Sequence, residues 1–293
     1  MTLSTVTVET MRTSRSRMSG VVRFSRRHPL IVVGGGLLGL LIVLALAAPL
    51  YGGDPVNMDP FQRLKPPSDE MWFGTDNLGR DVFARTIFGA RISLLVGLLS
   101  GACAALLGLL IGIIAGYIRG IDSVIMRVMD GLMSIPTILL AIALISLTGP
   151  GIGILIVAIA IPETPAVARL VRSVVLSVRE RPYVEAALCG GARLPKVLWR
   201  HVLPSTIPAL MVQSATVCAS AIMTEAALSF LGVGVPPEIS SWGNMIASSR
   251  LYLGIAPLTI FAPGICLAVT VLAVNLLGDG LRDMFDPRAG RRR

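Results

Sequence analysis

Long apolar segments, separated by short polar ones, run through most of this sequence. A helix needs roughly 20 apolar residues to cross a bilayer. Six segments are apolar and long enough to do so: 30–50, 92–118, 128–147, 151–178, 207–233 and 256–277. Pro162, Glu163 and Pro165 interrupt the fourth. Unpaired backbone groups are costly in lipid, so each segment is expected to be helical, and the short alternating strands of a barrel are missing. The pattern predicts an all-α integral membrane protein with six transmembrane helices.

The first apolar segment needs to be distinguished from an export signal. Arg26 and Arg27 precede it, as in a twin-arginine signal. Its apolar stretch is longer than the 7–15 or so residues of a signal's core, and further apolar segments follow. We interpret it as a retained first helix.

Composition and charge agree with a membrane protein. Of 293 residues 54% are hydrophobic and 15% charged, with a mean hydropathy of +0.76, whereas about 25% of the residues in a soluble domain are charged. With the N-terminus inside, the inner segments 1–29, 119–127, 169–201 and 282–293 hold 20 of the Lys and Arg residues, and the outer segments hold 6. The positive-inside rule therefore predicts cytoplasmic termini. The net charge of +9 is assigned to topology and anionic lipid, with no nucleic-acid partner.

The sequence lacks a nucleotide-binding or catalytic motif. Lys65 is followed by Pro66 and Lys196 by Val197, so neither lysine completes GxxxxGK[ST]. Four cysteines are scattered singly and only two histidines are present, which leaves neither a metal site nor a disulfide framework. We therefore expect a protein that is not an enzyme, without catalytic residues or cofactors of its own. Any ATP hydrolysis must take place on another chain.

One long basic loop, 174–204, stands out on the expected inner side. Ser177–Leu188 has helical composition, and the glycine pair Gly190-Gly191 is expected to end the helix in a turn. Pro195 suits the first turn of a second short helix. Two interpretations are open: a compact docking element on the cytoplasmic face, or an amphipathic helix lying on the membrane, which composition alone favours.

Four separated motifs resemble those of ABC importer permeases. Glu185-Ala186-Ala187, Gly191 and His201-Val202-Leu203-Pro204 are similar to the cytoplasmic EAA motif. Three others resemble segments of dipeptide, oligopeptide and nickel permeases: 73–82 with 89–94, 225–232 with 236–243, and 275–288. They occur in the family's order between about residues 20 and 290. The chain is identified as a member of this family.

The resemblance implies a type I ABC importer transmembrane fold in the bacterial inner membrane, with this chain as the C-type subunit. It implies four partners: a second, homologous permease forming a heterodimer, two cytoplasmic ATPase subunits that bind ATP and Mg²⁺, and an extracytoplasmic solute-binding protein. The path would carry dipeptides, oligopeptides or a related solute such as nickel, glutathione or a haem-like compound. The residues implied in coupling to the ATPase are Glu185, Ala186, Ala187, Gly191, His201 and Pro204.

The resemblance also implies a division of the chain. The expected parts are a cytoplasmic segment 1–29, a first transmembrane helix 30–51, an extracytoplasmic segment 52–91, an ABC transmembrane domain 92–280 with its coupling loop 174–204, and a cytoplasmic tail 281–293. The outer motif consists of Gly74, Thr75, Asp76, Gly79, Arg80 and Asp81. Capping and ion pairing among these residues explain the motif as well as partner docking does.

Three positions depart from the family pattern. Met71 stands where the family often has His, and Gly190 replaces a larger apolar residue, which predicts a looser turn. Glu163-Thr164 replaces a common Gly-Trp pair.

Two acids within apolar segments are candidates for the translocation path, because intramembrane charge is costly. Glu225 matches the family, which favours a packing or gating hydrogen bond. Glu163 either faces the path, where it meets a peptide's ammonium group, or pairs with Arg169 or Arg172 at the inner interface.

Two other classes of protein compete with a permease subunit. A secondary transporter often has internal repeats and discontinuous helices; the Pro162–Pro165 break fits, but the two halves show no repeat. A structural membrane anchor leaves the basic loop unexplained.

Overall fold

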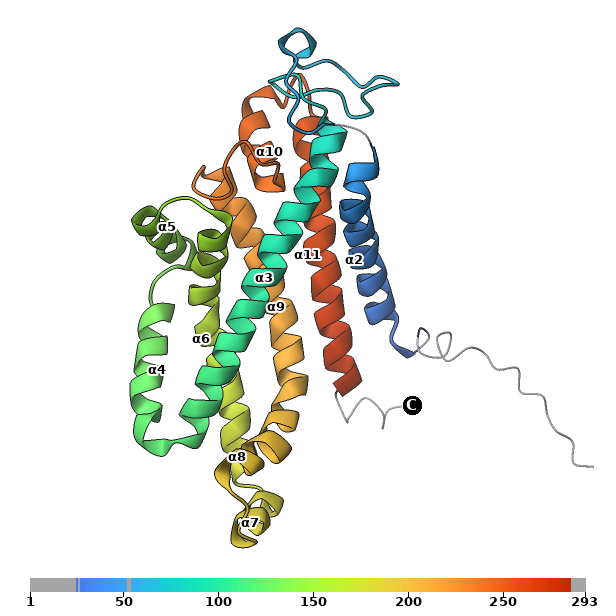
Figure 1. Ribbon diagram of the computed structural model, residues 1–293. Helices are drawn as coiled ribbons and strands as arrows, with labels where there is room; N and C mark the ends of the chain where they lie inside the picture. The colour runs from blue at the N-terminus through green and yellow to red at the C-terminus, as the bar shows by residue number, and fades with distance from the viewer. Residues whose placement is uncertain (1–24, 26, 52–53, 286–293) are drawn as a thin grey trace, which may run out of the picture.

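The computed structural model describes residues 25, 27–51 and 54–285. Five helical segments in this part of the chain are long and apolar enough to cross a membrane. Their principal helices are α2 (Pro29–Ala47), α3 (Val82–Tyr117), α6 (Ile152–Arg179), α9 (Leu203–Phe230) and α11 (Leu258–Phe285). They run alongside one another as a bundle (Figure 1). The expected motif residues 286–288 and most of the N-terminal segment lie outside the described residues.

The expected third span, 128–147, is wrong as a single helix. The structure has α4 (Arg119–Met133) and α5 (Thr137–Thr148), which meet at a bend of 92°. Pro136 disfavours helical geometry at the preceding residue, and the Ser134 hydroxyl donates to the Gly131 carbonyl at 2.7 Å where α4 ends. Counting the bent pair as one span gives six, in agreement with the predicted all-helical membrane fold. The pair begins at Arg119, inside the segment expected to be a polar inner loop.

The fourth span is continuous, in contrast to the predicted interruption. Pro162 and Pro165 both lie inside α6. Neighbouring helices allow prolines in a membrane helix, and here α3 supplies the packing surface. A Cβ at Gly108 would stand 2.5 Å from Cβ of Val167, so the two helices approach closely. Tertiary packing therefore overrides the local helix-breaking signal.

The bundle has two distinct ends (Figure 1). At one end lie α7 (Pro182–Cys189) and α8 (Leu194–Val197), together with the start of α2 and the end of α11. At the opposite end lie the loop before α3 and the short helix α10 (Trp242–Ser249). α3 begins at Val82, earlier than the expected Ile92, so the last part of the predicted outer segment is helical.

Candidate functional site

The segment between α6 and α9 folds into two short helices held on the end of the bundle. Pro195 occupies the first turn of α8, as predicted, and Pro182 occupies the first turn of α7, which begins inside the segment Ser177–Leu188 expected to be helical. Val184, Val197 and Val202 are fully buried. They join valines near the end of α6 in one apolar cluster: Val171, Val175 and Val178. These valines pack the base of the element against the end of the bundle.

Backbone hydrogen bonds close the turn between α7 and α8. The N–H groups of Gly190, Gly191 and Ala192 donate to the carbonyls of Ala186, Leu188 and Ala187 at 2.9, 3.0 and 3.0 Å. Gly191 has φ of +79°, the left-handed conformation in which glycine commonly ends a helix. The sequence predicted a break in the helix at the Gly190-Gly191 pair, and the structure has a turn there. Gly190 itself has an ordinary φ of −74°, and the looser turn expected from this glycine stays a prediction.

Most side chains on the outer surface of α7 are exposed. Glu185, Ala186 and Leu188 are exposed, while Ala187 is half-buried. The Tyr183 and His201 rings lie 5.9 Å apart and connect α7 to the segment leading into α9. α7 projects beyond the other helix ends (Figure 1). This arrangement favours a docking element over a helix lying along the bilayer.

A π-helical turn, Leu198–Val202, connects α8 to α9. It contains His201, which is half-buried, and it precedes Pro204, which is exposed in the first turn of α9. The Ser205 hydroxyl donates to the His201 carbonyl at 2.7 Å. The residues of the expected EAA motif are thus gathered on one element, with Glu185 on its tip and His201 and Pro204 at its base.

At the opposite end, the motif Gly74–Asp81 forms a closed turn that starts α3. Thr75 donates its hydroxyl to the Gln62 carbonyl and accepts from the Lys65 N–H at 2.8 Å. Gly74 and Gly79 have φ of +72° and +78°, and an added Cβ at either would collide with backbone, at Lys65 or Asp59. These glycines are required by both conformation and space.

Two acids of this motif have separate roles. Asp76 accepts from the N–H groups of Leu78 and Arg80, and its Oδ2 lies 2.7 Å from Nε of Arg80. Asp81 caps α3 by accepting from the Phe83 N–H at 2.9 Å. Burial raises the pKa of the Asp81 carboxyl, and backbone hydrogen bonds oppose that shift. The expected capping and ion pairing are therefore present.

Glu225 is fully buried at the contact of α9 with α3 and α10. Its Oε1 accepts from the Ser229 hydroxyl at 2.8 Å, and Ser229 Oγ accepts in turn from the Val235 N–H at 3.1 Å. The acid thus connects α9 with the loop that follows it. The sequence favoured a packing or gating hydrogen bond for Glu225, and the structure contains such a bond.

Glu163 is half-buried and contacts α9. Its Oε1 accepts from the Ser220 hydroxyl at 2.6 Å. The alternative pairing of Glu163 with Arg169 or Arg172 is wrong, because each arginine pairs with an acid of α4. Sequence reasoning missed these pairs because it assigned the first part of α4 to a loop. The available signal was a pair of acids eight residues apart in an amphipathic segment, Asp122 and Asp130, which indicated a helix with partners for the arginines.

Glu163 belongs to a row of incompletely buried polar residues on α6 and α9, which we call the polar seam. Spacings made up of steps of three and four residues place its members on one face of each helix. They are Glu163, Ser173 and Ser177 of α6, and Ser205, Gln213, Thr216 and Ser220 of α9. The two rows meet at the Glu163–Ser220 hydrogen bond and again at a cavity of about 350 Å³ lined by Ser173, Ser177 and Ser205. The seam extends from the middle of α6 to the base of α7.

Comparison with known proteins places the chain in a family. Residues 108–291 match the family described as "Binding-protein-dependent transport system inner membrane component". The chain is also 81% identical, over 93% of its own length and 94% of the relative's, to the "Probable peptide ABC transporter permease protein y4tQ" of Sinorhizobium fredii. The chain belongs to this family.

More distant permeases match over similar lengths. Identity is 40% to a "Dipeptide transport system permease protein DppC" of Alkalihalophilus pseudofirmus, over 90% of this chain and 87% of that one. The chain is 44% identical to a "Glutathione transport system permease protein GsiD" of Salmonella typhimurium, over 91% of this chain and 88% of that one. This chain is a membrane-embedded permease subunit of an ATP-driven ABC importer, and it works with the ATPase and solute-binding partners of such importers.

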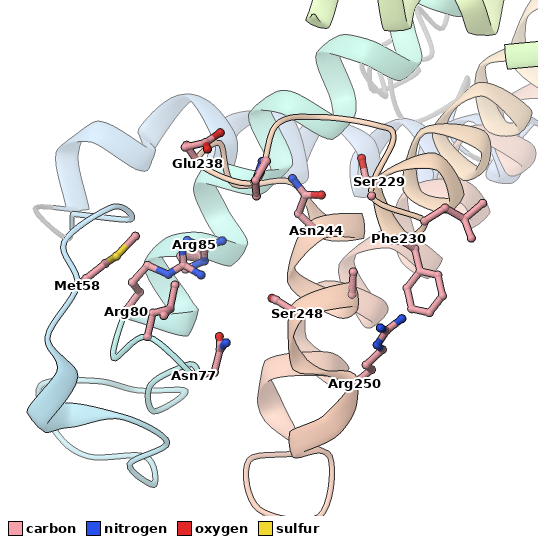
Figure 2. Close-up of a pocket in the computed structure, with 15 residues that line it drawn as sticks. Met58, Asn77, Arg80, Arg85, Ser229, Phe230, Glu238, Asn244, Ser248 and Arg250 are labelled. Carbon is pink, nitrogen blue, oxygen red and sulfur yellow. The ribbon is translucent and has the colours of Figure 1, made fainter. Parts of the chain in front are cut away.

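The permease also has a cavity of about 500 Å³ at the end opposite α7 (Figure 2). Its polar lining comes from segments far apart in the sequence: Asn77, Arg80, Arg85, Ser229, Glu238, Asn244, Ser248 and Arg250. α10 forms one wall, and Trp242 fixes that helix by donating from Nε1 to the Thr86 carbonyl at 3.0 Å. Sequence reasoning identified Arg80 but had no means of assembling this lining.

Proposed function

We propose that this permease forms half of the translocation path of an importer for dipeptides, oligopeptides or closely related solutes. The other half comes from a second, homologous permease. The cargo class is supported by relatives named for peptide, dipeptide and glutathione transport. ATP and Mg²⁺ bind to two separate ATPase subunits in the cytoplasm, and a solute-binding protein delivers cargo to the outer face.

Energy from ATP enters through the α7–α8 element, and this assignment carries the proposal. The element is anchored by Val184, Val197 and Val202, while Glu185 and Leu188 on its tip remain exposed. A force applied to α7 is therefore transmitted to α6 and α9, whose ends share the same apolar cluster. An anchored base with an exposed tip is what a coupling contact requires.

The polar seam supplies this chain's contribution to the path. Polar side chains that face lipid are costly, so a row of incompletely buried polar groups is expected to face water or protein instead. The seam begins at the Glu163–Ser220 hydrogen bond and ends beside Ser205, at the base of the coupling element. Motion of α7 would thus reach the residues that contact solute.

The proposed orientation places α7 and both termini in the cytoplasm. It is supported by the excess of basic residues in the segments at that end and by the common position of the start of α2 and the end of α11 (Figure 1). α10 and the loop before α3 are then extracytoplasmic.

Cysteine labelling of the assembled importer in membrane vesicles tests path and orientation together. The four native cysteines are first replaced by alanine or serine. A charged, impermeant reagent should label Phe61→Cys from outside, and it should label Leu188→Cys only from inside and only after the ATPase subunits have been stripped from the vesicles. Thr216→Cys on the seam should react, and its modification should block ATP-dependent dipeptide uptake, whereas the exposed apolar position Leu106→Cys should stay unlabelled. Labelling of position 188 from outside, or equal behaviour of positions 216 and 106, would contradict the proposal.

A further inference from the structure

The outer cavity has more positive than negative charge. Three guanidinium groups line it: Arg80, Arg85 and Arg250. Against them stand Glu238 in the lining and Asp76 behind it. Arg80 and Arg85 both approach the same oxygen, Oδ2 of Asp76, at 2.7 and 3.6 Å. One carboxylate is thus the ion-pair partner of two arginines whose side chains are almost completely buried. A buried charge without a partner of its own is costly.

Existing contacts leave Asp76 little capacity to neutralise more charge. Its Oδ1 already accepts from the N–H groups of Leu78 and Arg80 at 2.8 and 3.0 Å. Arg85 finds only one further acceptor in the described chain, the Pro55 carbonyl, at 3.2 Å from its Nη1. The Asp76 side of the cavity therefore has two fixed guanidinium groups beside one carboxylate, which leaves an excess of positive charge.

Two further charged side chains stand at the rim. Arg250 follows α10, and Glu238 lies on the loop between α9 and α10; both are exposed, and neither has an ion pair with any described residue. Figure 2 shows them on opposite sides of the cavity. The Asn244 amide fixes the Glu238 loop by donating to the carbonyls of Val235, Pro236 and Ile239, at 2.9, 3.1 and 3.3 Å. Glu238, on a loop fixed by Asn244, and Arg250 thus lie across the rim from each other.

The size and the rest of the lining define the ligand further. A volume of about 500 Å³ lies within the usual range for small-molecule sites, roughly 300–1,000 Å³. Apolar side chains share the lining with the charges: Met58, Leu78, Phe230, Leu231 and Pro237. A ligand that matches all of this has a carboxylate, an ammonium group and apolar side chains.

We propose that the outer cavity is a receiving site for a short zwitterionic peptide on its way from the binding protein to the path. The peptide spans the cavity, with its carboxylate toward Arg250 and its ammonium group toward Glu238 on the opposite side, and the buried Arg80 and Arg85 add to the positive charge of the lining. This inference rests on the proposed peptide cargo, and it adds a specific solute-contacting site on the outer surface of this chain.

Direct binding to the complete transporter in nanodiscs, without the solute-binding protein, tests this site. The probe is the dipeptide alanyl-leucine, observed by saturation-transfer NMR, with its C-terminal amide as the comparison. Wild type should bind the free dipeptide and bind the amide more weakly. Arg250→Gln should raise the dissociation constant for the free dipeptide by about tenfold, as expected for the loss of a charge-assisted hydrogen bond. Arg63→Gln, an exposed arginine of the outer loop outside the cavity, is the matched control and should have no effect.

Three results would overturn the inference: equal binding of the acid and the amide, equal effects of the two arginine substitutions, or no binding by a wild-type transporter that imports the dipeptide. A separate measurement determines the affinity of the peptide-free binding protein for the same nanodiscs. If Arg250→Gln weakens that docking and leaves dipeptide binding unchanged, the cavity is a protein-docking pocket and the inference is wrong. Absence of ATP-dependent dipeptide import by wild type would instead contradict the proposed function, so the two failures are distinguishable.

Discussion

Arg172 on α6 holds Asp122 on α4 with two parallel hydrogen bonds, Nε to Oδ1 at 2.5 Å and Nη2 to Oδ2 at 2.6 Å. A second pair on the same helices, Arg169 with Asp130, has a single contact of 2.6 Å and is more than half exposed on both sides. α4 is thus fastened to α6 chiefly at Asp122. Because α6 bears the polar seam and its end packs against the α7–α8 element, this contact places α4 beside the segments that we propose to move during transport.

The two ion pairs should differ in their effect on stability. Arg172→Ala breaks a two-point, partly buried pair and should cost about 1 kcal/mol or more, whereas Arg169→Ala breaks an exposed pair and should cost about 0.5 kcal/mol or less. The thermal midpoint of the purified complex measures both. The exchange Asp122→Arg with Arg172→Asp should recover part of the loss. Equal midpoints for the two alanine variants would refute the ranking.

Two glycines of α2 provide a matched test of its packing on α11. A Cβ at Gly34 would lie 2.7 Å from the Ala273 carbonyl oxygen, whereas nothing lies within 4 Å of one at Gly36. Gly34→Val should therefore destabilise the complex by about 1–3 kcal/mol, the usual cost of overpacking, and Gly36→Val should be neutral. Thermal unfolding in detergent is the measurement. A loss of the same size in both variants would show that helix propensity, rather than the α2–α11 contact, is responsible.

Glu225 should act through its hydrogen bonds rather than its charge. Glu225→Gln keeps an acceptor for the Ser229 hydroxyl and should be tolerated. Glu225→Ala leaves a void and removes the partner of Ser229, at a cost of about 1–3 kcal/mol. Expression level, thermal midpoint and dipeptide uptake should follow this order. Normal stability of both variants with loss of uptake in both would instead assign Glu225 to the path.

Glu163 should influence which solutes pass. We expect Glu163→Gln to impair the uptake of peptides with a free ammonium group more than that of N-blocked peptides. Ser220→Ala, which removes the hydrogen-bond partner but keeps the charge, is the control and should preserve the preference for a free ammonium. Equal losses for both peptide classes, together with lower expression, would make Glu163 a structural residue.

The membrane fold was predictable because a helix that crosses lipid needs a long apolar run, and such runs are visible without knowledge of tertiary structure. The predictions of helix boundaries were wrong where tertiary contacts determine whether a helix continues or breaks. α6 passes through Pro162 and Pro165 because α3 offers a close-fitting face at Gly108. The break before Pro136 had a local signal, a serine and a proline at a helix end, which the continuous hydropathy of 128–147 concealed.

The candidate sites divide in the same way. The left-handed turn at Gly191 was predictable, since a glycine pair after a helical segment is a local end signal. The pairing of Arg172 with Asp122 was not, because the residues are 50 positions apart and Asp122 was assigned to a loop. The outer cavity was beyond sequence reasoning for a related reason. It combines residues from before α3, the end of α9 and α10, and only the folded chain brings these segments together.

The most direct test of the account concerns the coupling element. Proline cannot adopt the φ of +79° found at Gly191, and it would also remove the hydrogen bond to the Leu188 carbonyl. Gly190→Ala is the matched control, because Gly190 has an ordinary φ and a Cβ there meets only mild crowding, at 3.3 Å from the Ala186 carbonyl oxygen. Glu185→Arg reverses a charge on the exposed tip without altering the turn.

The measurement is ATP hydrolysis stimulated by the solute-binding protein, in proteoliposomes containing the complete importer, with subunit stoichiometry determined on the same samples. Gly191→Pro and Glu185→Arg should remain inserted and paired with the second permease. Both should fall to the unstimulated rate and lose their ATPase subunits more readily in detergent, while Gly190→Ala retains stimulation. Wild-type stimulation in both Gly191→Pro and Glu185→Arg would contradict the claim that energy enters through this element.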